Sequence, residues 1–165
     1  MIDDSYLCKL PEVAQSKNRE NIKFLSRLRQ LAPHDIDALF HAEHEEVFSY
    51  TDCMSCANCC RTTGPLLLPS DIKRLAKAMK LPEGEFYKKY VRKDEDHDYI
   101  FEAMPCPFLL DDNSCSVYAH RPTACREYPH TNRRKMYQIL DLTMKNYAIC
   151  PAVFDIIENI KASTQ

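Results

Sequence analysis

The chain has 165 residues and an almost balanced charge, with 22 Lys and Arg against 24 Asp and Glu. This length suits one domain, or one domain with a helical extension, and it is enough for a real hydrophobic core. The balance of charge excludes the basic surface typical of nucleic-acid-binding proteins, and no apolar run approaches the roughly 20 residues of a membrane helix. With no secretory signal at its start, we expect a cytoplasmic protein that has neither a nucleic-acid nor a membrane partner.

Two helices are predicted in the first 49 residues. Apolar residues recur at three- and four-residue spacing over residues 11–31, Pro33 interrupts the pattern, and a second helix follows over residues 35–48. We expect these helices to form an antiparallel pair over residues 1–49. Residues 50–165 then form a cysteine-cluster domain, packed with that pair into one compact unit.

The rest of the chain predicts an α+β fold, mostly helical, with a small β-hairpin and a cysteine-rich metal-binding loop region. The dense cysteine segment is predicted as a loop, with Asn58 able to adopt a left-handed conformation, and Ser70 as the N-cap of the helix that follows. The other predicted elements are helical turns over 85–91, strand 99–101, a hairpin of 108–110 with 115–118, a short helix from 121 to 126, strand 136–142 and a helix from Pro151.

Cysteine carries the functional information in this chain, because eight of the nine cysteines are clustered. Clustered thiols in a reducing compartment are more often metal ligands than disulfides. The predicted ligands are Cys53, Cys56, Cys59, Cys60, Cys106, Cys115, Cys125 and Cys150. Cys8 stands apart, and we expect it to be a small buried hydrophobic residue.

The spacing within the first cluster suits iron–sulfur chemistry, although zinc accepts the same donors. Cys53, Cys56 and Cys59 form a C-x2-C-x2-C run that matches three ligands of a ferredoxin-type cluster, and a remote Cys-Pro pair is the usual fourth partner. Adjacent side chains usually diverge, so we expect Cys60 to belong to a second site with some of Cys106, Cys115, Cys125 and Cys150. Four thiolates suit zinc equally well. The division of the eight thiols stays open.

The ordered motifs resemble those of the YkgJ-like cysteine-cluster family. They are Cys53-x-x-Cys56-x-x-Cys59-Cys60, Cys106-Pro107-Phe108-Leu109, Cys115-Ser116-Val117-Tyr118, the segment 121–129 and Cys150-Pro151. Members of this family carry a domain described as zinc- or iron-chelating, and some are described as iron–sulfur proteins. The resemblance implies chelation by the eight cysteines. A similar cysteine pattern occurs in flagellin lysine methylases, which are larger chains. This chain resembles only their cysteine domain, so the resemblance does not imply methyl transfer.

Other polar residues near the cysteines are expected to have structural roles. Tyr118, Arg121 and Arg126 match motif positions of the family, and we expect the arginines, with Arg61, to offset the negative charge of the thiolates. His41 and His44 lie one helical turn apart, and we expect a solvated face rather than a chelating pair. Three further histidines could bind the metal or donate a hydrogen bond to one of its ligands, but we expect each to be a surface residue: His97, His120 and His130.

Three functions remain open at this point. The first is binding of iron, as an iron–sulfur cluster, or of zinc, with a role in redox chemistry or electron transfer and an unknown redox partner. The second is a structural zinc module that serves as a protein-interaction platform. The third is a metal-dependent modification enzyme. Such an enzyme needs an open coordination position on its metal, and eight cysteine ligands would fill two sites and leave none open.

Overall fold

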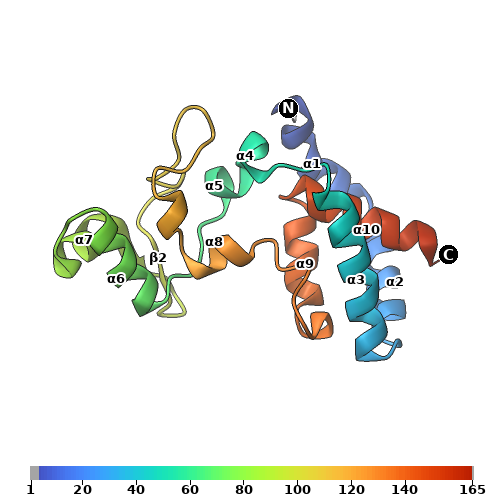
Figure 1. Cartoon of the computed structure of the whole chain (residues 1–165). Helices are drawn as coiled ribbons and strands as arrows, with labels where there is room; N and C mark the ends of the chain where they lie inside the picture. The colour runs from blue at the N-terminus through green and yellow to red at the C-terminus, as the bar shows by residue number, and fades with distance from the viewer. Residues whose placement is uncertain (1–3, 165) are drawn as a thin grey trace. The chain divides into compact units, whose positions relative to one another are not determined.

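The fold is that of a computed structural model, which describes residues 4–164 and contains two compact units. Unit 1 comprises the chain up to Asp52 together with the chain from Pro129 onward, and unit 2 comprises Cys53–Tyr128. Each unit has a hydrophobic core of its own, and the two cores share no residue. Helices predominate in both units (Figure 1).

The helices of unit 1 are α1 (Asp4–Ser16), α2 (Asn18–Leu28), α3 (Pro33–Phe48), η2 (Met136–Gln138), α9 (Leu140–Tyr147) and α10 (Pro151–Ser163). The single helix predicted over residues 11–31 is wrong, because the helical chain breaks at Lys17 and Pro11 lies inside α1. Helix α3 confirms the second predicted helix, and it begins with Pro33 in the first turn, where a missing N–H costs nothing.

Residues 136–142 are helical, so the strand predicted there is wrong. They form η2 and the start of α9. Met136, Leu140 and Tyr147 are all buried, and their separations of four and seven residues place them on one face of a helical path. The core of unit 1 forms where α10 packs against α3 and α9, around side chains such as Phe40 and Ile156.

A buried ionic cluster lies beside the core of unit 1. The Lys161 ammonium donates to Asn21 Oδ1 and lies 2.7 Å from Glu158 Oε1 and 2.8 Å from Glu20 Oε1. The Tyr147 hydroxyl also donates to Glu158 Oε1, at 2.8 Å. Because each charge in the cluster has a partner, the lysine is accommodated at 3 % exposure.

Unit 2 has short elements joined by turns. They are α4 (Cys53–Cys56), α5 (Asn58–Thr62), α6 (Pro69–Ala78), α7 (Glu83–Tyr90), β1 (Val91–Lys93), β2 (Tyr99–Phe101), η1 (Tyr118–His120) and α8 (Thr123–Glu127). Strands β1 and β2 pair in antiparallel register, with Arg92 opposite Ile100. The predicted fold class, mostly helical α+β with a small hairpin, is therefore confirmed.

The hairpin predicted over residues 108–118 is wrong in detail. Only Leu109 and Cys115 pair there, as an isolated antiparallel bridge, and Tyr118 begins η1 instead of ending a strand. The turn between them closes tightly, because the N–H of Leu110 donates to Ser114 O at 2.9 Å and Asn113 adopts a left-handed conformation with φ of 67°. Each arm is too short to build a ladder of strands.

Asp71, and not Ser70, organises the start of α6. Its buried carboxylate accepts from the N–H of Leu68 at 3.0 Å and from Arg74 Nη2 at 2.6 Å. It also accepts from the N–H of Thr123 at 3.2 Å and from the Thr123 hydroxyl at 2.9 Å. Burial alone would raise the pKa of Asp71, but these hydrogen bonds outweigh it and lower that pKa. One carboxylate thus ties α6 to the first residue of α8.

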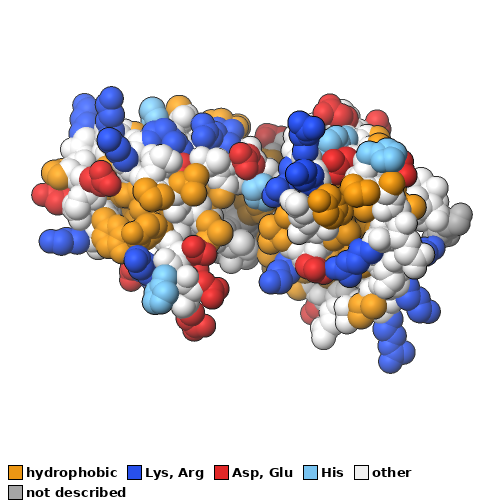
Figure 2. Space-filling view, turned by 90° about the horizontal axis from the view of Figure 1, so that it is seen from below, with side chains coloured by type: hydrophobic (Ala, Val, Ile, Leu, Met, Phe, Trp, Pro, Cys, Tyr) orange, Lys and Arg blue, Asp and Glu red, His pale blue; other side chains and the backbone are white. Residues whose placement is uncertain are grey.

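Charged side chains of both signs are interspersed on the face shown in Figure 2, as a net charge of −2 leads us to expect. Among the described residues, none of the helices combines the length and the apolar character that crossing a membrane requires. Hydrophobic side chains gather in patches between the charged groups on that face.

His41 and His44 do not form a merely solvated face. His41 Nε2 lies 2.9 Å from Arg133 O, and His44 Nδ1 lies 2.8 Å from the hydroxyl of the buried Thr131. The His44 ring also lies against Phe48, with 4.5 Å between the ring centroids. Both histidines therefore hold the segment after Pro129 against α3.

We predict that Asp71→Asn destabilises unit 2 by about 3 kcal/mol, because Arg74 and Thr123 would lose a buried charged acceptor. Urea unfolding followed by far-ultraviolet circular dichroism measures the change. Asp111→Asn, the same substitution at an exposed position, serves as the control, and it should change stability by less than about 0.5 kcal/mol. Equal losses in the two variants would show that Asp71 has no special role in joining α6 to α8.

We also predict that unit 1 loses stability as pH falls from 7 to 5, and that His44→Asn removes part of this loss. Burial lowers the pKa of His44, the Glu45 charge opposes this shift, and His41 adds a smaller lowering. The unfolded chain therefore binds the proton more readily than the folded chain. The contribution of neutral His44 to the free energy of unfolding is complete above the unfolded pKa of about 6.5 and is lost as the pH falls below it. Denaturation midpoints measured across this pH range test the prediction, with the exposed His34→Asn as control. If both variants kept the wild-type dependence of the midpoint on pH, His44 would not be responsible for the loss.

Candidate metal centre

The structure places seven of the eight predicted ligands in unit 2. Cys150 lies in unit 1, at the residue before α10 begins. Cys8 lies in α1 and is exposed, so the expectation of a buried hydrophobic residue is wrong for it.

The dense cysteine segment forms two short helices, not the predicted loop. Cys53 and Cys56 occupy one turn in α4, the chain reverses at Ala57 with φ of 50°, and Cys59 and Cys60 follow in α5. The N–H of Ala57 donates to Cys53 O at 2.9 Å and closes the turn. The left-handed residue is thus Ala57, where Asn58 was expected. Cys56 is buried and Cys53 is exposed.

Four thiols from three distant segments of unit 2 lie within electrostatic range of one another. They are Cys60, Cys106, Cys115 and Cys125, which we call the cysteine quartet. The N–H of Cys106 donates to Cys60 O at 2.8 Å, and the Leu109–Cys115 bridge returns the chain toward the same place. Cys125 lies in α8, whose first residue is held by Asp71. The four side chains are all half-buried.

The electrostatics of the quartet favour one thiolate among three protonated thiols. Burial first, and then the negative charge of Cys60, raises the pKa of Cys106 to about 11 and that of Cys125 to about 12. The pKa of Cys115 is raised for the same reasons. A hydrogen bond from the Cys59 thiol and the charge of Arg61 outweigh burial at Cys60 and lower its pKa to about 7. A bound cation would favour ionisation of the other three.

Two of the arginines expected to offset thiolate charge lie where they do so. After the Cys59 hydrogen bond, the Arg61 guanidinium contributes to the lowered pKa of Cys60, and the Arg121 guanidinium opposes the rise in the pKa of Cys115 and Cys125 without overcoming it. Arg121 also lies over the Tyr118 ring, with 3.9 Å between its guanidinium carbon and the ring centroid, and donates to Tyr118 O. Arg126 is exposed and donates to the Thr123 hydroxyl.

The quartet fits a metal by the chemistry of its donors, because four thiolates suit both zinc and iron. As the described side chains stand, no three His, Cys, Asp or Glu residues converge closely enough to hold an ion. The electrostatic coupling of the four thiols acts over a longer range than a metal–sulfur bond of about 2.3 Å.

The histidines of unit 2 do not extend this set. His97 is exposed and takes a turn conformation with φ of 64°, and His120 is also exposed, with its carbonyl accepting from Arg74 Nε at 3.3 Å. His130 belongs to unit 1 and is half-buried, so the expectation of a surface residue is too simple for it.

Sequence reasoning missed two residues that hold the quartet in place. Asp71 ties α8 to α6, and Asn113 accepts a hydrogen bond from Arg61 Nη2. Asp71 could have been found from its place three residues after Leu68, where an acidic side chain bonds back to the start of a helix. Asn113 could have been suspected from its place in a polar turn.

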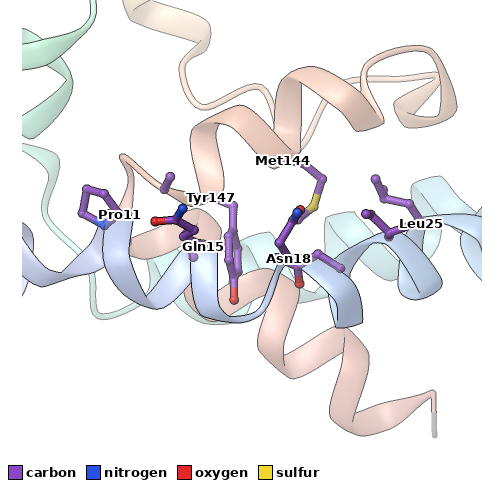
Figure 3. A pocket seen from close by; sticks show the side chains of 10 residues that line it. Pro11, Gln15, Asn18, Leu25, Met144 and Tyr147 are labelled. Carbon is purple, nitrogen blue, oxygen red and sulfur yellow. The ribbon is translucent and has the colours of Figure 1, made fainter.

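A pocket of about 350 Å³ in unit 1 lies away from these thiols in the sequence and contains no cysteine (Figure 3). Residues of α1, α2 and α9 line it, and they include Leu25, Met144 and Tyr147. Its walls are mostly apolar and also carry the carboxamides of Gln15, Asn18 and Asn21. The pocket offers no set of ligands for a metal ion.

Comparison with known proteins agrees with the cysteine pattern. The family model CxxCxxCC, described as a putative zinc- or iron-chelating domain, matches residues 52–150. Separate searches of curated proteins and of solved structures found no match. The matched segment contains all eight clustered cysteines and covers more than half of the chain. The chain therefore belongs to the CxxCxxCC family, and its domain is of the kind described as chelating zinc or iron.

Proposed function

We propose that this protein binds iron or zinc through cysteine thiolates, and that the cysteine quartet forms one four-thiolate site within unit 2. The observation that carries the proposal is that the thiol of Cys60 in α5 lies within electrostatic range of three thiols that come about 50 residues later in the sequence. Core packing alone gives no reason to gather four polarisable, ionisable side chains at one place. Cys53, Cys56, Cys59 and Cys150 remain predicted ligands.

A structural role for the metal suits the architecture of unit 2. Between β2 and α8 the chain has no paired strands and only one short 3-10 helix, η1, among its described residues. Cys106 and Cys115 lie in this stretch and pack against the core of the unit, while Cys60 and Cys125 approach from α5 and α8. Metal bonded to the four would cross-link three segments, so its binding free energy would contribute directly to folding.

A redox role is the second candidate, and the spacing of the cysteines in α4 and α5 supports it. The three thiols of the C-x2-C-x2-C run lie on two consecutive helical turns separated by the left-handed Ala57. This run is the one that ferredoxin-type clusters use, and such a cluster would supply one-electron transfer. In that case the partner is an unidentified redox protein.

We predict that Cys115→Ser lowers metal content by one site and lowers the melting temperature, because serine does not replace a soft thiolate ligand. Elemental analysis of protein purified without oxygen measures the loss, with Cys8→Ser as the control. Cys8 lies outside the family match, so its replacement should change neither quantity. A Cys115→Ser protein with full metal content and an unchanged melting temperature would remove Cys115 from the site.

Comparison with Cys56→Ser tests the division of the thiols. If the quartet is a site of its own, each single variant loses a different part of the metal and the double variant loses both. If all the thiols serve one site, either single variant loses as much metal as the double variant.

Visible absorption separates the two candidate roles. An iron–sulfur cluster gives brown protein with a band near 400 nm that bleaches on reduction, accompanied by acid-labile sulfide. A zinc site gives colourless protein with one or two zinc ions per chain. We expect one of these two results, and protein without either metal would contradict the proposed function.

A further inference from the structure

The Arg61 side chain joins two cysteine-bearing parts of unit 2, which are helix α4 and the turn between Cys106 and Cys115. Its Nη1 donates to Cys56 O at 2.7 Å, and its Nη2 donates to Asn113 Oδ1. Asn113 lies in the turn between Cys106 and Cys115. Arg61 itself belongs to α5, and its half-buried guanidinium contacts both α4 and the turn that separates two members of the quartet.

The turn is shaped to present this carboxamide. Asn113 has φ of 67°, a conformation that asparagine tolerates better than most residues, and its N–H donates to Leu110 O at 3.0 Å. A second tie lies close by, because the N–H of Cys106 donates to Cys60 O. The Arg61–Asn113 bond and the Cys60–Cys106 bond together fix the turn against α5 at two points.

We propose that Arg61 and Asn113 form a clasp that positions Cys60 against the Cys106–Cys115 turn, so that Arg61 sets the metal affinity of the quartet without binding the metal. This inference rests on the proposed function. Arginine suits the role because its planar guanidinium can donate to two acceptors at once, whereas lysine supplies only a point charge. Four thiolates around a divalent ion leave a net charge of about −2, which a fixed cation beside Cys60 stabilises.

Three substitutions separate the two contributions of Arg61. Arg61→Met removes both the charge and the clasp, while Arg61→Lys keeps the charge and loses the two-pronged contact. Asn113→Gly removes only the acceptor, because glycine adopts the same positive φ at no steric cost. Arg92→Met is the control, since it removes an exposed guanidinium from β1, an element of unit 2 that contains no cysteine.

Titration of the metal-depleted full-length chain with Co²⁺ gives the affinity, and the sulfur-to-cobalt charge-transfer band shows that thiolates bind the ion. We expect Arg61→Met to weaken Co²⁺ binding by about tenfold or more, as loss of a residue that orients a ligand does. Arg61→Lys should recover part of this loss, and Arg92→Met should stay within about twofold of the wild type. Circular dichroism checks that each variant is folded.

The double variant Arg61→Met/Asn113→Gly decides whether the two residues act as one device. If they form a clasp, adding Asn113→Gly to Arg61→Met causes no further loss, although Asn113→Gly alone weakens binding. Independent, multiplying losses would overturn the clasp, as would wild-type affinity in Arg61→Met. Absence of a thiolate band in the wild-type protein would instead refute the proposed function itself.

Discussion

Four half-buried thiols within electrostatic range of one another are the constraint on which unit 2 depends. Burial and mutual repulsion keep three of them protonated, and only Cys60 titrates near neutrality, with a pKa of about 7. A cation removes this restriction, because it stabilises every thiolate that it binds. The same segments have little regular secondary structure, so bonds from sulfur to metal would supply a cohesion that their short elements do not.

Two polar devices bring the thiols to this place. The Asp71 carboxylate ties α6 to Thr123 and thereby positions α8 with Cys125. The Arg61 guanidinium reaches from α5 to Asn113 in the turn between Cys106 and Cys115. The Arg61–Asn113 and Asp71–Thr123 hydrogen bonds each join residues that are 52 positions apart in the sequence. Unit 1 has its own core and its own ionic cluster around Lys161, and it needs no metal ligand to account for either.

The sequence predicted much of the site's chemistry but only part of its structure. Cysteine spacing is a local property, so the candidate ligands and the family followed from the motifs alone. The strand predicted over residues 136–142 failed because a short apolar run is ambiguous, and burial of Met136, Leu140 and Tyr147 decided for helix. The roles of Asp71 and Asn113 depend on contacts with distant segments, which no local pattern contains. The membership of the quartet depends on the same long-range folding.

X-ray absorption at the metal K-edge, on full-length protein purified without oxygen, tests the central claim most directly. We expect a first shell of four sulfur atoms at about 2.3 Å, whether the metal is zinc or the iron of a cluster. Cys115→Ser should lose this shell at one site while Cys8→Ser keeps it. A first shell made of nitrogen and oxygen atoms at about 2.0–2.2 Å would contradict the account, because it would mean that the cysteines are not the ligands.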